Sequence, residues 1–169
     1  MLFSVSYLND LILIVRAIKQ VGLKIALNGG SGGFVIPDFY KSVGGLTEGL
    51  LGVAHWNHDC NADAQKVNDV YKKMYGEFLF EYAGGLVAQT FMIADALERA
   101  ASTDPQKVRD AIAALDVSSG YAAMGPGGKV KFGPDGKNIY AHPVGVQWQG
   151  GDLASVFPKE DARVPLLKS

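Results

Sequence analysis

The sequence predicts an α/β protein with parallel strands, and three features of the chain lead to that prediction. A helical pattern is followed directly by the short apolar run Leu23–Leu27, which is the order of an αβ unit. The run ends in the glycine-rich stretch Asn28–Gly33, and ligands of open α/β sheets sit beyond the carboxyl ends of strands. Toward the carboxyl end the hydrophobic period changes from about 3.6 residues to about 2, which indicates a β-hairpin region.

Composition excludes several classes of protein. A chain of 169 residues, 48% of them hydrophobic and 20% charged, is long enough to bury the core of a single domain. The net charge of −1 gives no electrostatic footprint for nucleic acid or for an anionic membrane. The single cysteine, Cys60, excludes an internal disulfide. Phe3–Val15 is apolar but interrupted by Asn9 and Asp10 and lacks a basic start, so we expect neither a signal peptide nor a membrane span there.

The first third of the chain is predicted to alternate helices and strands. The apolar residues at helical spacing are Leu8, Leu11, Ile12, Val15 and Ile18. Gly22 is placed to end this helix before the strand 23–27, and only residues 1–5 are available to form a strand before it. Pro37 favours a short helix over 37–43, and the apolar run 50–56 predicts a further strand.

Three helices are predicted in the middle of the chain, mainly from their end signals. Asn61 is a suitable N-cap for a helix that ends at Gly76, and residues 82–101 form the longest helical pattern. Gly84 and its neighbour Gly85 cost that helix about 1 kcal/mol each relative to alanine, and we expect either close packing or fraying at that end. The pair Asp104-Pro105 predicts an N-cap and first turn.

The carboxyl-terminal third is predicted to be loop and antiparallel strand. Residues 118–128 form a glycine-rich loop, after which Val130 and Phe132 alternate with lysines. The alternating run 144–148 and the short segment 153–156 are separated by a glycine turn, and the mostly polar end, 158–169, is expected to wrap the surface.

The glycine-rich stretch is the first candidate for a binding site. Glycines after a strand let backbone N–H groups approach a ligand, although a plain tight turn is the alternative. Neither the phosphate-binding pattern G-x-x-x-x-G-K-[ST] nor G-x-G-x-x-G with a later acidic partner is present here. We therefore expect no nucleotide site.

Two further groups of residues suggest alternative chemistry. His55–Cys60 contains two histidines, an aspartate and a cysteine, which could supply three ligands to zinc with His142 as the only other histidine. A solvated loop after the strand is the alternative interpretation. Ser31 lacks the spacing of a nucleophile elbow, although many folds could bring a histidine beside it. Both hypotheses stay open from the residues alone.

Several motifs occur in an order that resembles a known family. They are Ser6-Tyr7-Leu8-Asn9-Asp10, Gly22-Leu23-Lys24, Gly29-Gly30-Ser31-Gly32, Thr47-Glu48-Gly49-Leu50, Tyr82-Ala83, Asp104-Pro105-Gln106-Lys107-Val108-Arg109, Phe132-Gly133-Pro134-Asp135-Gly136-Lys137-Asn138, Val146-Gln147-Trp148-Gln149-Gly150-Gly151 and Val156-Phe157-Pro158. No single motif is specific, but the ordered set resembles the C-terminal half of the solute-binding proteins of branched-chain amino-acid type ABC transporters. The resemblance covers essentially the whole chain.

The resemblance implies a partial periplasmic-binding-protein-like three-layer αβα fold with parallel strands and a C-terminal β-hairpin region. Family members have two α/β lobes, joined by three crossovers, that close on a small ligand. By this likeness, residues 1–54 are the second half of the ligand-closing lobe, and residues 58–122 are helices of the other lobe. Residues 123–169 return to the first lobe and end in a tail. The chain is therefore expected to be a fragment that lacks the N-terminal half.

The same likeness implies which residues touch the ligand. Tyr7 matches the cleft tyrosine of the family, and Phe78 belongs to a hinge-side region that can supply an apolar wall. Ser31 stands where amino-acid binders often carry an acidic residue, and a hydroxyl cannot neutralise a ligand ammonium. Either another carboxylate serves, or the ligand is an organic carboxylate, which a group of glycine N–H donors suits. The ligand-binding candidates are Tyr7, Gly29, Gly30, Ser31, Gly32 and Phe78.

The resulting functional prediction is a solute-binding component of an ABC-type importer, with no catalytic, cofactor or metal site. The expected partners are a small amino acid or organic carboxylate and, for the full-length protein, a membrane permease. Full-length members are periplasmic or lie in the cell envelope, whereas the address of this chain stays open. We expect the chain to self-associate through an unpaired sheet edge and uncovered helices. The alternatives are a small metal-binding or hydrolytic protein using His55–Cys60 or Ser31, and a ligand-free remnant.

Overall fold

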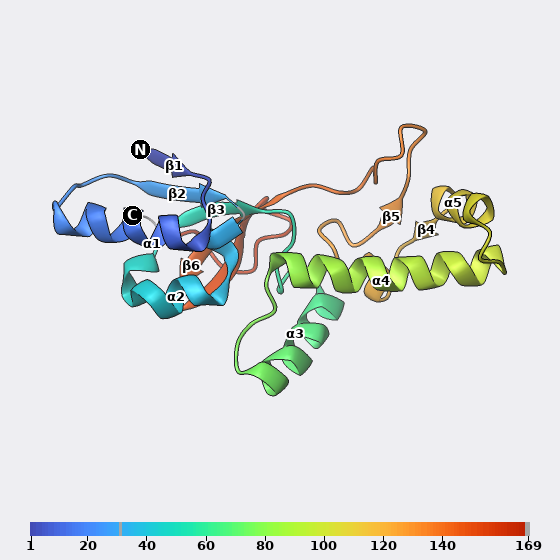
Figure 1. The fold of residues 1–169 in the computed structure, drawn as a ribbon, viewed down its shortest axis with the longest axis horizontal. Coiled ribbons are helices and arrows are strands. Elements are labelled where there is room, and N and C mark those ends of the chain that lie inside the picture. Colours follow the sequence, from blue (N-terminus) through green and yellow to red (C-terminus); the bar gives the residue numbers. More distant parts are fainter. Residues whose placement is uncertain (31, 168–169) are drawn as a thin grey trace.

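Residues 1–30 and 32–167 are described by a computed structural model, in which five strands form one sheet at one end of an elongated molecule (Figure 1). In sheet order the strands are β1 (Leu2–Ser4), β2 (Leu27–Gly30), β3 (Leu51–Ala54), β6 (Val144–Gln149) and β7 (Asp152–Phe157). The first three strands are parallel, whereas β6 pairs antiparallel with β3 and with β7. The predicted α/β class, with parallel strands and a C-terminal hairpin, is confirmed.

The helices divide between the two ends of the molecule. Their bounds are α1 Leu8–Gln20, α2 Pro37–Val43, α3 Ala62–Tyr75, α4 Glu81–Ala100 and α5 Pro105–Ala113. Helices α1 and α2 lie along one face of the sheet, while α4 and α5 extend away from it together with the short strands β4 (Asp116–Val117) and β5 (Val130–Lys131) (Figure 1). Within the described part of the chain, no helix has the length and apolar character needed to cross a membrane.

Local side-chain chemistry sets the predicted helix ends. The Asn61 side chain accepts hydrogen bonds from two backbone N–H groups in the first turn of α3, at 3.1 and 3.0 Å. Asp104 does the same for α5, at 3.1 and 3.0 Å. Gly76 ends α3 in the left-handed conformation with φ of 77°. These caps confirm the predictions made from Asn61, Gly76 and Asp104.

The predicted strand 23–27 is wrong in position, because β2 begins where the apolar run ends. It spans Leu27–Gly30, so two of the predicted turn glycines are extended strand residues. The ring of Phe34 covers β2 and β3, and a Cβ on Gly29 or Gly52 would come within 2.3 or 2.4 Å of it. Glycine at these two strand positions therefore makes room for a core aromatic ring.

The larger hydrophobic core lies between the sheet and helices α1 and α2. It contains Leu11, Val15, Leu27, Phe34, Val35, Phe39, Ala54, Phe78, Val144, Val146, Trp148 and Leu153. Trp148 is fully buried, and its indole N–H donates to the carbonyl oxygen of Phe34 at 3.0 Å. On the opposite face of the sheet, Phe3 and Val53 are about half exposed (52% and 43%).

A second core lies under α3 and the amino-terminal half of α4. Its buried members are Trp56, Cys60, Ala64, Leu79, Ala88 and Met124. The Trp56 indole N–H donates to the carbonyl oxygen of Met124 at 3.1 Å, and Gly84 of α4 lies directly against the Trp56 ring. The glycine pair in α4 is thus explained by close packing at Gly84, one of the two expected outcomes.

Candidate functional site

An open pocket lies at the carboxyl ends of the parallel strands β1 and β2. It has a volume of about 500 Å³ and is lined by Tyr7, Leu8, Asn9, Gly32, Gly33, Ile36 and Tyr82. Three segments meet there: the start of α1, the turn that follows β2 and the first turn of α4. This is the edge of an open α/β sheet at which ligands bind.

The turn after β2 packs closely on the start of α1. The Gly33 N–H donates to the carbonyl oxygen of Ser6 at 3.1 Å. A Cβ on Gly33 would lie 2.4 Å from the backbone nitrogen of Leu8, so only glycine permits this approach. As a result, Tyr7 and Gly32 line the same pocket although 25 residues separate them in the sequence.

The ligand-binding candidates take different positions in the fold. Tyr7, which is 83% exposed, lines the pocket with Gly32, whereas Ser31 lies outside the described residues. Gly29 faces the core ring of Phe34, and Gly30 lies against the ring of Phe3 on the other face of the sheet.

Phe78 lies elsewhere, in the larger core. It is 5% exposed, and its ring centroid is 5.8 Å from that of Trp148 and 5.1 Å from that of His58. It also lines a separate pocket with residues of α2 and of the β6–β7 turn. The roles of all six candidates in ligand contact stay predictions.

Tyr82 is a pocket residue that was not among the six candidates. It stands in the first turn of α4, and its hydroxyl oxygen accepts a hydrogen bond from the Gly32 N–H at 3.4 Å. The sequence shows Tyr82 only as an aromatic residue at the start of a predicted helix. That pattern alone does not indicate that Tyr82 lies beside a turn 50 residues earlier in the chain. Through Tyr82, helix α4, which packs on the second core, forms one side of the pocket.

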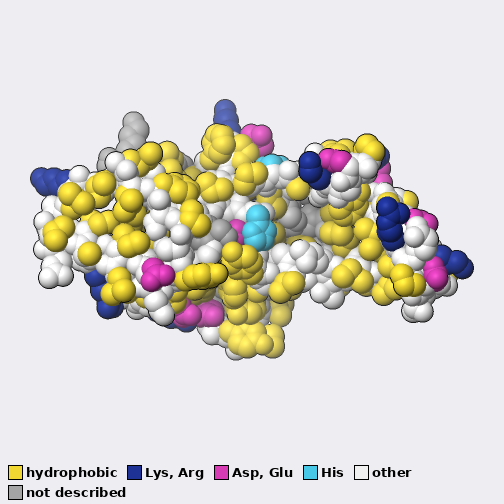
Figure 2. Space-filling view, turned by 45° about the horizontal axis from the view of Figure 1, so that its top comes forward, with side chains coloured by type: hydrophobic (Ala, Val, Ile, Leu, Met, Phe, Trp, Pro, Cys, Tyr) yellow, Lys and Arg dark blue, Asp and Glu magenta, His cyan; other side chains and the backbone are white. Residues whose placement is uncertain are grey.

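His55, whose ring packs against that of Tyr82, is tied to α4 by a buried carboxylate. Oε1 of Glu81 accepts from the His55 backbone N–H at 2.5 Å and lies 2.6 Å from its ring Nδ1. The Glu81 side chain is fully buried, whereas that of His55 is 54% exposed and its ring centroid lies 5.5 Å from that of Tyr82. Histidine side chains reach the surface in the middle of the molecule, between the sheet and the α4–α5 end (Figure 2).

The potential metal ligands within His55–Cys60 turn to different partners. His58 pairs with Asp152 at 2.9 Å, while the Asp59 carboxylate accepts from the backbone N–H of Ser155 at 2.8 Å. Burial raises the pKa of the Cys60 thiol to about 12, which disfavours the thiolate that a metal or a nucleophilic reaction requires. In the described ranges, no three His, Cys, Asp or Glu side chains gather as a metal site. The metal or hydrolytic alternative is not favoured.

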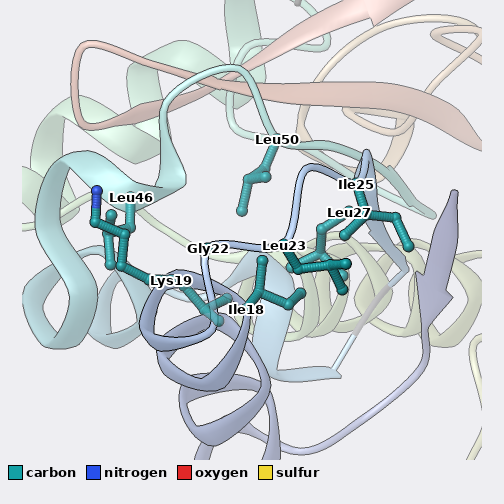
Figure 3. A pocket seen from close by; sticks show the side chains of 9 residues that line it. Ile18, Lys19, Gly22, Leu23, Ile25, Leu27, Leu46 and Leu50 are labelled. Carbon is teal, nitrogen blue, oxygen red and sulfur yellow. The ribbon is translucent and has the colours of Figure 1, made fainter.

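A further cavity, of about 320 Å³, lies away from the Tyr7 pocket, beside the end of α1 and the segment that leads to β2. Figure 3 shows Leu50 facing the side chains of Ile18 and Leu23 across it. Apart from Lys19 its lining is apolar or glycine, so it offers few groups to orient a ligand. The residues first expected in a strand, Leu23 and Ile25, line this cavity instead.

The pocket lies at the ends of parallel strands, and helix α4, which packs on the second core, borders it. This is the architecture of an α/β ligand-binding protein. The family model of the periplasmic binding proteins matches residues 1–152, and the chain belongs to that family. Leu/Ile/Val-binding protein homolog 8 of Brucella melitensis biotype 1 is 31% identical over 169 residues, covering 93% of this chain and 40% of the relative. Homolog 7 of Brucella abortus is 30% identical, with 90% and 40% covered. The chain thus spans about 40% of the length of these curated relatives.

Solved structures show the same fold at lower identity. A leucine-binding protein of Thermotoga maritima has a TM-score of 0.73 and 24% identity, covering 92% of this chain and 43% of the other. A solute-binding protein of R. palustris in complex with benzoate has a TM-score of 0.73 and 15% identity, covering 99% and 44%. The substrate-binding protein LivJ of Streptococcus pneumoniae, in complex with isoleucine, has a TM-score of 0.72 and 17% identity, covering 92% and 44%.

Proposed function

We propose that this chain forms one side of the ligand cleft of a solute-binding protein that serves an ABC-type importer. The observation that carries the proposal is the pocket formed by Tyr7, Gly32 and Tyr82 at the carboxyl ends of β1 and β2. Family membership supports a role for this pocket in solute binding, because the family model that matches the chain is that of the periplasmic binding proteins. Its role is to bind and release a solute.

The proposed division into lobes follows the two hydrophobic cores. Residues 1–54 share one sheet with β6 and β7 of residues 123–169. Residues 58–122 contain helices α3 to α5 and most of the second core, whose members Trp56 and Met124 lie just outside this range, whereas Phe78 within it belongs to the larger core. We assign the sheet to the ligand-closing lobe and the helices to the opposite lobe. Hinge motion between two such bodies would change the distance from Tyr7, on the sheet side, to Tyr82 on α4.

The proposed ligand is a small amino acid or a related organic carboxylate. Among the structural neighbours with a ligand in place, one contains isoleucine, one leucine and one benzoate. All three ligands carry a carboxylate on a small apolar body, which suits a pocket lined by two tyrosines and aliphatic side chains. The full-length protein would act in the periplasm or cell envelope, together with a membrane permease.

A thermal-shift screen tests binding by the chain itself. Branched-chain and aromatic amino acids and their carboxylate analogues are added to the wild-type chain, and a saturable rise in Tm is expected for a ligand. Tyr7→Ala removes an exposed pocket side chain and should abolish the shift without lowering the unliganded Tm. Tyr75→Ala, at a tyrosine that is 62% exposed at the end of α3, is the matched control. A flat response from a cooperatively melting wild-type chain would contradict the proposal for this chain.

We also propose that the chain self-associates. Phe3 and Val53 on the sheet, and Leu86, Phe91 and Ile93 on α4, are all between 43% and 63% exposed. Contact between copies would remove such apolar surface from water. Light scattering at tens of micromolar tests this, and a monomeric mass would refute it.

A further inference from the structure

Two segments of the chain cross between the sheet and helices α3 to α5. Residues 55–61 lead from β3 to α3, and residues 132–143 lead back from β5 to β6 (Figure 1). A motion of these helices relative to the sheet has to bend both segments, because they are the covalent links between the two parts. The stretch after β7, residues 158–167, returns to this junction and bonds to both of them.

Arg163 holds the first of these segments. Its Nε donates to the carbonyl oxygen of Asp59 at 2.8 Å, and its Nη2 donates to the carbonyl oxygen of Cys60. The Arg163 backbone N–H donates to the carbonyl oxygen of Ser155 in β7 at 2.8 Å. One residue therefore joins the outgoing segment to the last strand of the sheet. A guanidinium stays charged in proteins, so this contact does not titrate.

Asp161, two residues earlier, holds the second segment. Its Oδ2 lies 2.5 Å from Nε2 of His142, and the Asp161 side chain is only 11% exposed. The other ring nitrogen of His142, Nδ1, lies 3.0 Å from the carbonyl oxygen of Tyr140. Gly127 packs against the same place, since a Cβ there would lie 2.6 Å from the Tyr140 carbonyl oxygen and 3.3 Å from Cε1 of His142. The ring is thus held in one orientation between a carboxylate and a carbonyl.

Both ring nitrogens of His142 face hydrogen-bond acceptors. An imidazolium donates from both, whereas either neutral tautomer turns one lone pair toward an oxygen atom. The hydrogen bond to Asp161 outweighs burial and, together with the Tyr140 carbonyl and the charge of Glu160, raises the pKa of His142 above 6.5. The nearby cation Lys129 lies over the Tyr140 ring, 5.4 Å from its centroid. Geometry and charge therefore both favour the protonated ring in this contact.

We propose that residues 161–163 form a clasp that joins the two crossing segments, and that the clasp is closed while His142 is protonated and loosens when His142 loses its proton. The inference goes beyond the proposed function, because the clasp acts on the fold and needs no ligand. When it loosens, residues 132–143 are freed from residues 158–167, and helices α3 to α5 are less tightly coupled to the sheet.

Trypsin measures the opening of the clasp, because cleavage after Arg163 requires its side chain to leave the carbonyl oxygens of Asp59 and Cys60. Cleavage after Lys137, whose side chain is 83% exposed, is the internal reference, and the ratio of the two rates removes the pH dependence of trypsin itself. Between about pH 6 and about pH 9 the ratio should rise at least about tenfold, the effect of losing one charge-assisted hydrogen bond. A constant ratio would refute the inference.

Two variants separate the ion pair from a general loosening of the chain. His142→Gln can form hydrogen bonds but carries no charge, so its ratio should be high throughout and show no step with pH. Glu160→Gln removes the charge of the exposed neighbour of Asp161 and should keep the step. If His142→Gln does not fold, ¹⁵N NMR of the wild-type imidazoles decides. The step must then share the midpoint of the His142 titration, and a step with a different midpoint overturns the inference.

Hydrogen exchange tests whether the clasp joins the two segments. The wild-type and Asp161→Asn chains are compared by mass spectrometry at one pH below 6.5, where His142 is protonated. Exchange should become faster in residues 55–61 as well as in residues 132–143, and should stay unchanged in β2. Faster exchange confined to residues 132–143 and 158–167 would refute the coupling. None of these measurements uses a ligand, so a failure of this inference is distinguishable from a failure of the proposed function.

Discussion

Replacing Gly84 by alanine sets two opposing effects against each other at one position of α4. In an ordinary helix interior this change stabilises by about 1 kcal/mol, because alanine restricts the unfolded chain and favours the helix. Here a Cβ would lie 2.3 to 2.4 Å from three atoms of the Trp56 ring. That ring is 2% exposed and is anchored by its hydrogen bond to Met124, so it cannot easily move aside.

The expected change in the free energy of unfolding for Gly84→Ala is the difference between the two effects. Overpacking a core costs about 1–3 kcal/mol, and the rigid ring and three short contacts place Gly84→Ala near the upper end. After subtraction of the helix gain of about 1 kcal/mol, we expect a net destabilisation of about 1–2 kcal/mol. In the adjacent Gly85→Ala the new Cβ meets only the ring of the half-exposed His55, at 3.3 Å from Nε2 and 3.9 Å from Cδ2. A contact at 3.3 Å needs a displacement of only a few tenths of an ångström at a half-exposed ring. Gly85→Ala should therefore be neutral or stabilising by up to about 1 kcal/mol.

Urea unfolding followed by circular dichroism measures both variants against the wild-type chain at one protein concentration. The expected result is a lower midpoint for Gly84→Ala and an equal or higher one for Gly85→Ala, with similar m-values. Equal stabilisation by both substitutions would refute the packing of α4 on Trp56. A large change in m would instead indicate an altered denatured state or an additional intermediate.

Three further predictions concern titratable groups. Burial raises the pKa of Asp152, but the hydrogen bond and charge of His58, with the charge of Lys72 and the Leu153 N–H, outweigh it and lower that pKa from 3.8 to about 2. After allowance for solvent, about 1 kcal/mol of stability is present above pH 3.8 and should be lost as pH falls toward 2. Asp152→Asn should remove this loss in urea titrations. The hydrogen bond to Asp161 raises the pKa of His142 above 6.5 in the folded chain. The stability that this pair contributes is therefore fully present below pH 6.5 and is lost as pH rises through the raised pKa of the folded state. The urea midpoint should show this decline in the wild-type chain but not in His142→Gln. Cys60, 3% exposed with a pKa of about 12, should react with a thiol reagent only as fast as the native chain opens; rapid modification without urea would contradict its burial.

Elements defined by local chemistry were predictable from the sequence. Asn61 and Asp104 cap their helices through bonds to residues two and three positions ahead, and no distant contact is needed to recognise them. The position of β2 was not predictable in this way. Glycines usually indicate a turn, and only the ring of Phe34, which packs over both strands, explains glycine at strand positions 29 and 52.

Some residues of the candidate site were likewise predicted from the sequence, and others were not. The family likeness pointed to Tyr7 and Gly32, which the structure brings to one pocket. Tyr82 comes to this pocket, and Glu81 to His55, because α4 packs on Trp56, a contact between residues that are distant in the sequence. The hydrophobic pattern of α4 indicates a buried face, but it does not say which strand end that face will meet.

The segment that leaves the sheet after β3 is bonded on both sides, and this constrains how a cleft at the pocket could close. Its first residue, His55, is held by Glu81 of α4, whereas the Asn57 side chain donates to the carbonyl oxygen of Leu153 in β7 at 2.8 Å. The Asp59 carboxylate also accepts from the backbone of β7. A motion that separated α4 from the sheet as a whole would break one of these two sets of buried bonds, each costly to leave unmade. Closure is therefore expected to pivot at this segment, so that His55 moves with Tyr82 while Tyr7 stays with the sheet.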